Sequence, residues 1–81
     1  MELLLEEPDT RYSLLRRLAI FSREYEIMIL MAEGLADKEI AERLGISRFT
    51  VNRHVRSLLL KLDATSRTQA AVKALKLGLI D

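Results

Sequence analysis

Three side chains at positions 52, 53 and 56 have hydrogen-bonding groups that can recognise the edges of DNA bases. The amide of Asn52 can donate to and accept from one adenine, and the guanidinium groups of Arg53 and Arg56 can each pair with N7 and O6 of a guanine. At about 100° per residue, a helix through them places both arginines opposite an apolar stripe, with Asn52 on its flank. Charge on a helix is commonly just a solvated face. An assignment to base recognition therefore depends on the elements that position these residues.

The helix that carries these side chains is predicted over residues 48–62. Its apolar stripe has the helical spacing of a core-facing surface and consists of Val51, Val55, Leu58 and Leu62. A shorter helix precedes it, with an apolar face made of Ile40, Ala41 and Leu44. Gly45 can end this first helix in a left-handed conformation, and Ser47 can cap the second. Two helices joined by such a sharp turn have the pattern of a helix-turn-helix.

A supporting helix is expected between Ser22 and Gly34. Ser22 is the predicted N-cap, Glu24 and Glu26 fall in the first turn, and Gly34 ends the helix. Its core-facing side consists of Ile27, Met28, Leu30 and Met31. For the following helix we expect Asp37 as the cap, because Ala36 stands where a capping box with Glu39 would place serine or threonine.

The first 20 residues form a separate segment in this interpretation. Residues 1–8 are acidic and leucine-rich and end at Pro8, after which Asp9 or Thr10 can cap a helix that runs to Ala19. The apolar side of this helix is made of Tyr12, Leu14, Leu15 and Leu18. It either covers one edge of the core or acts as a linker or dimerisation helix, and the sequence does not decide between these roles.

The last helix is predicted to start at Ser66, where Gln69 completes a capping-box pattern, and to stop at Gly78. One apolar face consists of Ala70, Ala74 and Leu77. A second group widens the apolar arc beyond what one core requires, namely Thr68, Ala71, Val72 and Leu75. We expect this second group to form a twofold dimer contact.

Length and composition limit the chemistry. A chain of 81 residues has room for one domain with a modest core, which argues against catalysis in a deep cleft. The absence of cysteine excludes disulfides and thiolate zinc sites, and the sequence shows no nucleophile with a base and an orienting carboxylate around the one histidine, His54. No apolar run is long enough to span a bilayer. We therefore expect a cytoplasmic protein that is not an enzyme, without a catalytic site, metal or other cofactor, and with no membrane partner.

The charges are divided unequally along the chain. Residues 1–40 contain five basic and nine acidic side chains and carry a charge of −4, whereas residues 41–81 contain eight and three and carry +5. The net charge of +1 conceals this difference. Positive charge thus lies in the half with the cationic helix, where phosphate groups would have to be neutralised.

A set of motifs between residues 20 and 80 resembles the DNA-binding domain of LuxR-type regulators, the group that includes FixJ, NarL and GerE. The matching positions are residues 21–27, Gly34, residues 38–41, Leu44, residues 46–47, residues 50–51, His54, residues 61–62, Arg67, Ala70 and residues 78–80. The resemblance implies an all-α, four-helix helix-turn-helix domain over residues 21–81, here with an additional N-terminal helix. It also implies that the third helix enters the major groove and that the fourth pairs with a second protomer on an inverted repeat.

The resemblance also implies individual roles. Base contacts would fall at Asn52, Arg53 and Arg56, and contacts to the DNA backbone at Lys38, Ser47, Arg48, Thr50, His54 and Lys61. The chain departs from the common pattern at Ala36, Phe49 and Asn52. Asn52 replaces a frequent lysine and is expected to alter base preference. Phe49 either presses on a thymine methyl or sugar or packs on the N-terminal helix, and packing is the outcome we expect.

The leading hypothesis is a transcription regulator that binds a specific double-stranded DNA site as a homodimer. A second hypothesis is a protein interaction module in which the first and last helices mediate assembly. A third is a promoter-binding module like region four of a sigma factor, with RNA polymerase as partner. Salt-dependent, site-specific binding separates the first hypothesis from the second, and binding that requires polymerase would indicate the third.

Overall fold

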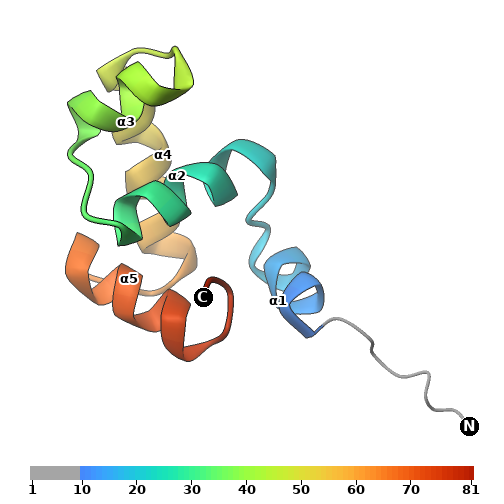
Figure 1. The fold of residues 1–81 in the computed structure, drawn as a ribbon. Coiled ribbons are helices and arrows are strands. Elements are labelled where there is room, and N and C mark those ends of the chain that lie inside the picture. The colour runs from blue at the N-terminus through green and yellow to red at the C-terminus, as the bar shows by residue number, and fades with distance from the viewer. Residues whose placement is uncertain (1–9) are drawn as a thin grey trace, which may run out of the picture.

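The computed structural model describes residues 10–81, and within that range all regular secondary structure is helical (Figure 1). The expected all-α fold with an additional N-terminal helix is confirmed. The predictions for residues 1–8 and for a cap at Asp9 lie outside the described residues. The helices are α1 (Thr10–Leu18), α2 (Ser22–Ala32), α3 (Asp37–Leu44), α4 (Arg48–Lys61) and α5 (Arg67–Lys76).

Helices α2 to α5 form one bundle, and α1 stands to the side of it (Figure 1). Within the bundle α3 packs on α4, and α2 contacts α3, α4 and α5. The predicted stripe of α4 is buried along its full length, and the core-facing residues predicted for α2 and α3 join it. Ile20, Leu79 and Ile80, which lie outside the helices, are also buried in this core. The bundle therefore fixes α4 by one side and leaves its other side free.

The turn between α3 and α4 has the predicted geometry. Gly45 adopts φ 69° and ψ 34°, a left-handed conformation that costs glycine little because it has no Cβ. The amide of Ile46 donates to the carbonyl of Ala41 at 3.1 Å, which closes the end of α3. Ser47 then caps α4, since its hydroxyl oxygen accepts from the Thr50 amide at 3.0 Å. These bonds set the angle at which α4 leaves α3.

Two predicted caps are wrong. Phe21, not Ser22, occupies the N-cap of α2, with no side-chain cap bond, and Ser22 is already the first helical residue. This boundary also places Glu26 beyond the first turn, where it pairs with Arg23 at 3.1 Å. The boundary of a helix depends on how the preceding chain enters it, which residue type alone does not specify.

The cap of α3 is Ala36, not Asp37. Ala36 has the extended conformation of an N-cap, and its amide donates to the Glu39 carboxylate at 2.7 Å. That bond is one half of a capping box; the other half is missing because alanine has no side-chain acceptor. At the start of α5 the predicted cap is confirmed, since the Ser66 hydroxyl accepts from the Gln69 amide at 3.1 Å.

Replacing Ala36 with serine is expected to raise the free energy of unfolding by about 1 kcal/mol, because it adds the missing acceptor for the first turn of α3. Chemical denaturation followed by circular dichroism measures the change. Ala36→Val is the control: it adds a larger side chain at the same exposed position without an acceptor. Equal stabilisation by both substitutions would contradict the capping explanation.

Helix α1 covers one edge of the bundle in part. Leu14, Leu15 and Leu18 pack against the core but remain partly exposed. Arg11 adds a polar link to the other end of the chain: its guanidinium donates to the Gly78 carbonyl at 3.1 Å and to the Asp81 carboxylate at 2.7 Å. Of the two roles open for this helix, coverage of a core edge has direct structural support.

Candidate nucleic-acid interface

The exposed side of α4 presents the three predicted base-contacting residues together. Asn52, Arg53 and Arg56 are all exposed, and within residues 10–81 their side chains form no hydrogen bond or ion pair. On the opposite side of the helix Val51, Val55 and Leu58 are buried. The polar groups are therefore held on a fixed helix, while their donors and acceptors remain available to a ligand.

Two of the predicted backbone-contacting cations lie at helix starts. Lys38 is exposed in the first turn of α3, and Arg48 is the exposed first residue of α4. Neither forms an ion pair within the described part of the chain. The amides at a helix N-terminus attract anions, so a cation at each of these two places is suited to a phosphate.

Ser47 and Thr50 are joined by their side chains. The Ser47 hydroxyl donates to the Thr50 hydroxyl oxygen at 2.9 Å, while its own oxygen accepts from the Thr50 amide. The hydrogen of the Thr50 hydroxyl is not used by these bonds and can still be donated. The structure thus gives Ser47 a capping role and leaves Thr50 with a donor at the beginning of α4.

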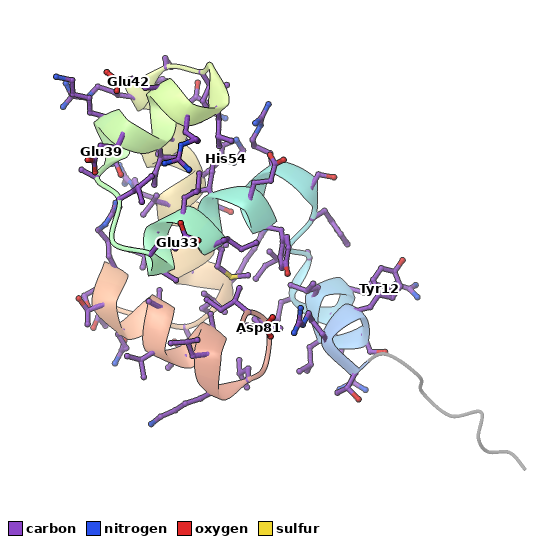
Figure 2. The ribbon with its side chains drawn as sticks, viewed as in Figure 1. Tyr12, Glu33, Glu39, Glu42, His54 and Asp81 are labelled. Atoms are coloured by element: carbon purple, nitrogen blue, oxygen red, sulfur yellow. The ribbon has the colours of Figure 1, made fainter. Side chains whose placement is uncertain are left out.

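Lys61 lies in a polar cluster between α4 and α2 that sequence reasoning did not anticipate. Its ammonium donates to the Glu24 carboxylate at 2.6 Å and to the Ala19 carbonyl at 2.7 Å. The other carboxylate oxygen of Glu24 lies 3.8 Å from Nδ1 of His54, which is partly buried beside α2 (Figure 2). Glu24 is the centre of this cluster and has only 14% of its side chain exposed. It links two residues of α4 to the supporting helix.

The cluster holds the Lys61 side chain in a fixed position on α4. Two of the three ammonium hydrogens of Lys61 are engaged inside the protein, which leaves one for a ligand. The sequence motifs included Glu24, His54 and Lys61 separately, but nothing in them indicated that the three side chains meet. Glu24 and Lys61 lie 37 positions apart, a separation that no helical periodicity covers.

A second long-range contact fixes the start of the helix-turn-helix. Arg67, the first residue of α5, donates to the Asp37 carboxylate at 2.6 Å and to the Leu35 carbonyl at 3.0 Å. The carboxylate predicted to cap α3 thus binds α5 instead. Arg67 matched the family motif in the sequence, but nothing local to it indicated this partner.

Phe49 does not pack on the N-terminal helix. Its side chain is 72% exposed in the first turn of α4, so the expectation of packing is wrong. Helix α1 lies at the other end of the molecule from the α3–α4 turn, beyond the reach of this ring (Figure 1). The ring therefore stays on the outer side of α4, next to the candidate base-contacting residues.

The second apolar group predicted on α5 is on the surface. Val72 and Leu75 are 41% and 49% exposed, Thr68 is exposed, and Ala71 is partly buried. Together with Ala32, Leu35 and neighbouring residues they line a shallow hollow between α5 and the end of α2. Within residues 10–81 no other side chain covers the exposed members of this group.

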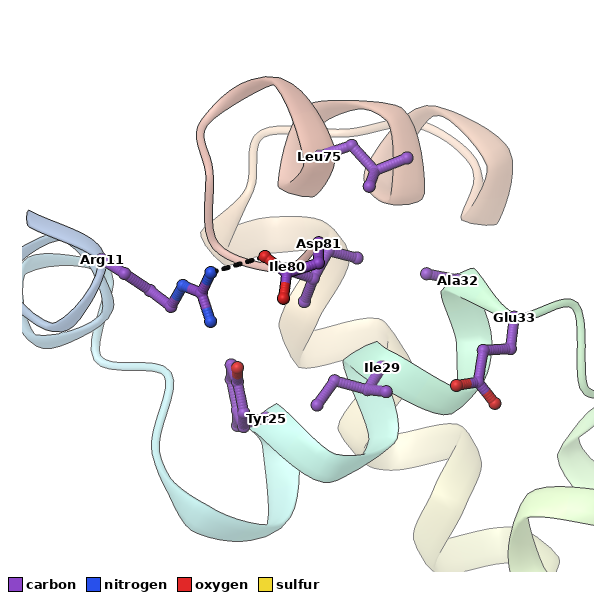
Figure 3. A pocket seen from close by; sticks show the side chains of 8 residues that line it. All are labelled: Arg11, Tyr25, Ile29, Ala32, Glu33, Leu75, Ile80 and Asp81. Carbon is purple, nitrogen blue, oxygen red and sulfur yellow. Dashed lines mark hydrogen bonds and ion pairs between the residues drawn. The ribbon is translucent and has the colours of Figure 1, made fainter.

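A separate hollow lies between α1, α2 and α5 (Figure 3). The charged groups on its wall are Arg11, Glu33 and Asp81, of which Arg11 and Asp81 neutralise each other. Asp81 raises the pKa of the Arg11 guanidinium above its ordinary value by direct attraction. The described residues contain no group of three or more acidic or histidine side chains that could hold a metal ion.

A short helix, a left-handed glycine turn and a second helix buried on one side and cationic on the other define a helix-turn-helix domain. The chain belongs to the luxR family of bacterial regulatory proteins, whose sequence profile matches residues 20–74. The resemblance found in the sequence is thereby confirmed.

Individual relatives agree with this assignment. The chain is 48% identical over 62 residues to the transcriptional activator protein SolR of Ralstonia nicotianae, a match covering 76% of this chain and 26% of SolR. It is 50% identical over 56 residues to the transcriptional regulatory protein LiaR of Bacillus subtilis, covering 69% of this chain and 26% of LiaR. The chain thus spans about a quarter of the length of these relatives. Their names describe regulators of transcription and not enzymes.

None of the helices within residues 10–81 combines the length and hydrophobicity that crossing a bilayer requires.

Proposed function

We propose that this chain is a sequence-specific DNA-binding domain of a transcription regulator, with α4 in the major groove. The observation that carries the proposal is the set Asn52, Arg53 and Arg56, which has no partner among residues 10–81 and lies on the exposed side of a helix whose opposite side is buried. An α-helix fits the major groove, and these are the side chain types that pair with adenine and guanine there. The excess of basic residues after position 40 supports binding to a polyanion.

Backbone phosphates are proposed to contact residues around this set. Lys38 and Arg48 supply exposed cations, Thr50 supplies a free hydroxyl hydrogen, and Ser47 orients Thr50. His54 and Lys61 stay in the proposed contact set as partly buried residues that Glu24 holds in place. In this proposal the phosphate contacts set the register of α4 in the groove, and the three base-contacting residues supply specificity.

We assign DNA binding to residues 21–81 and treat residues 1–20 as a separate segment. The family profile begins at residue 20, and the polar side-chain link from α1 itself runs through Arg11 to the C-terminal residues. The segment meets the bundle where the Ala19 carbonyl accepts from Lys61 of α4 and Ile20 enters the core. We also propose a cytoplasmic location, because the proposed DNA target of a bacterial regulator lies there.

Binding to DNA is proposed to involve two copies of the chain. The exposed apolar group on α5 provides a surface for a twofold contact, which would put two copies of α4 on an inverted repeat. Each α4 would then occupy one half-site. A contact made by one short helix of each protomer buries little surface, so the dimer is expected to form mainly on DNA.

Selection of bound sequences from a random DNA library, followed by a salt titration on the selected site, tests the function. We expect an inverted repeat whose binding constant falls steeply as salt rises, because each phosphate contact releases a counterion. Recovery of no preferred sequence would contradict the proposal and favour an interaction module. Binding that occurs only when RNA polymerase is added would favour the sigma-like alternative.

Replacing Leu75 with glutamate is expected to abolish the complex with two protomers on the inverted repeat and leave one protomer bound per half-site. The new carboxylates would face each other in an apolar contact, where unpaired charge is costly. Gel-shift stoichiometry measures the effect. Phe21→Glu introduces the same charge at a similarly exposed apolar side chain outside α5 and should retain the two-protomer complex. An unchanged complex with Leu75→Glu would place the dimer contact elsewhere.

A further inference from the structure

The most exposed large hydrophobic side chains of the described residues both lie on α4. Leu60 is 84% exposed and Phe49 is 72% exposed, although the domain has a core in which such side chains could be buried. At about 100° per residue, both fall within roughly 40° of Arg53 around the helix. They belong to the side of α4 that carries the proposed base-contacting set.

Their positions along the helix separate them. Phe49 is the second residue of α4, within about one helical turn of Asn52 and Arg53. Leu60 is next to the last residue, roughly 16 Å further along the axis at about 1.5 Å per residue. In a helix-turn-helix the N-terminal residues of the second helix contact the base edges. Phe49 is thus the exposed hydrophobic residue placed to meet the floor of the groove.

The apolar character of a phenylalanine ring limits which group of a base it can contact favourably. It has no hydrogen-bond donor or acceptor, so it gains nothing from the polar atoms that the bases present in the major groove. The apolar group there is the C5-methyl of thymine, and burying a methyl against a ring removes both surfaces from water. Contact with a polar base edge would instead desolvate that edge without a partner.

We propose that Phe49 is a specificity-determining residue that recognises the C5-methyl of a thymine beside the base pairs contacted by Asn52 and Arg53. The inference rests on the proposed function, because it requires α4 in the major groove. It adds an apolar element to a recognition surface otherwise made of hydrogen-bonding groups. Each half-site of the preferred DNA then contains one thymine whose methyl group contributes to binding.

The test replaces each thymine of the selected site, one position at a time, with deoxyuridine, which lacks the methyl group and keeps the same pairing edge. For the unaltered chain we expect about a fourfold loss of affinity at one thymine per half-site, the fold-change that corresponds to about 0.8 kcal/mol for one buried methyl. Phe49→Ala is expected to bind the thymine and deoxyuridine sites equally. Leu60→Ala, the matched control on the same side of α4, should keep the fourfold difference. Because Phe49 is exposed, its replacement by alanine leaves the core intact. The circular dichroism spectrum of the variant checks that its helices are unchanged.

Three results would overturn the proposal. They are a selected half-site without thymine, insensitivity of the unaltered chain to deoxyuridine at every position, and a Phe49→Ala variant that still loses affinity on deoxyuridine. If the proposed function itself is wrong, the selection from the random DNA library yields no preferred sequence, and this result appears before any deoxyuridine site is made. That earlier result would overturn the thymine contact as well.

Discussion

Replacing Arg53 with alanine is expected to reduce discrimination between the selected DNA site and a site altered at one base pair by about 1 to 3 kcal/mol. The guanidinium is exposed and has no partner within residues 10–81, so its loss removes no bond from the folded domain. A good bidentate pair with guanine contributes this amount, because the wrong base leaves donors unpaired in the groove. Arg56→Ala is expected to act similarly at a neighbouring base pair.

Competition binding with the selected and altered sites at one fixed salt concentration measures this discrimination. The matched control is Arg17→Ala, which removes the same charge from an exposed position on α1, outside the helix-turn-helix. It should weaken binding to both sites slightly and equally, through general electrostatics alone. If Arg53→Ala and Arg56→Ala discriminate as well as the unaltered chain, the assignment of base contacts to α4 is wrong.

Replacing Leu58 with alanine is expected to lower the free energy of unfolding by about 2 to 5 kcal/mol. Leu58 is fully buried in the stripe by which α4 packs on the bundle, and its loss leaves a cavity that the neighbouring helices only partly fill. This loss is a large share of the roughly 5 to 15 kcal/mol by which domains are stable, so the unfolded fraction of the variant rises steeply. DNA binding should fall in proportion to the unfolded fraction.

Thermal and chemical denaturation measure the loss, and the chain offers a close control. Leu60→Ala makes the same chemical change two positions later on the same helix, at a side chain that is 84% exposed. Its effect on stability should stay within about 0.5 kcal/mol. Equal destabilisation by both substitutions would contradict the burial of one side of α4.

Helix α4 and the turn before it could be predicted because their determinants are local. The stripe through Val51, Val55 and Leu58 repeats within a few residues, and Gly45 and Ser47 act on amides and carbonyls within a few positions of themselves. The division of charge is likewise a property of the chain order. Local patterns of this kind determined the fold class and the side of α4 that faces solvent.

Helix boundaries were the weaker part of the prediction. Ser22 and Asp37 are good capping residues by type, but each is the first helical residue and not the cap. A shift of one position changes which side chain is free for another partner. Asp37 illustrates this, because its carboxylate binds Arg67 at the start of α5 instead of an amide of its own helix.

Only the tertiary structure decided which distant groups meet. Glu24 binds Lys61 from 37 positions away, Arg67 binds Asp37 from 30, and Arg11 binds Asp81 from 70. It also decided that Phe49 stays on the outer side of α4, since the helix expected to cover it lies at the other end of the molecule. Periodicity describes one element at a time, whereas these contacts depend on how whole elements pack. The sequence by itself determined what each helix presents, and packing decided what each side chain touches.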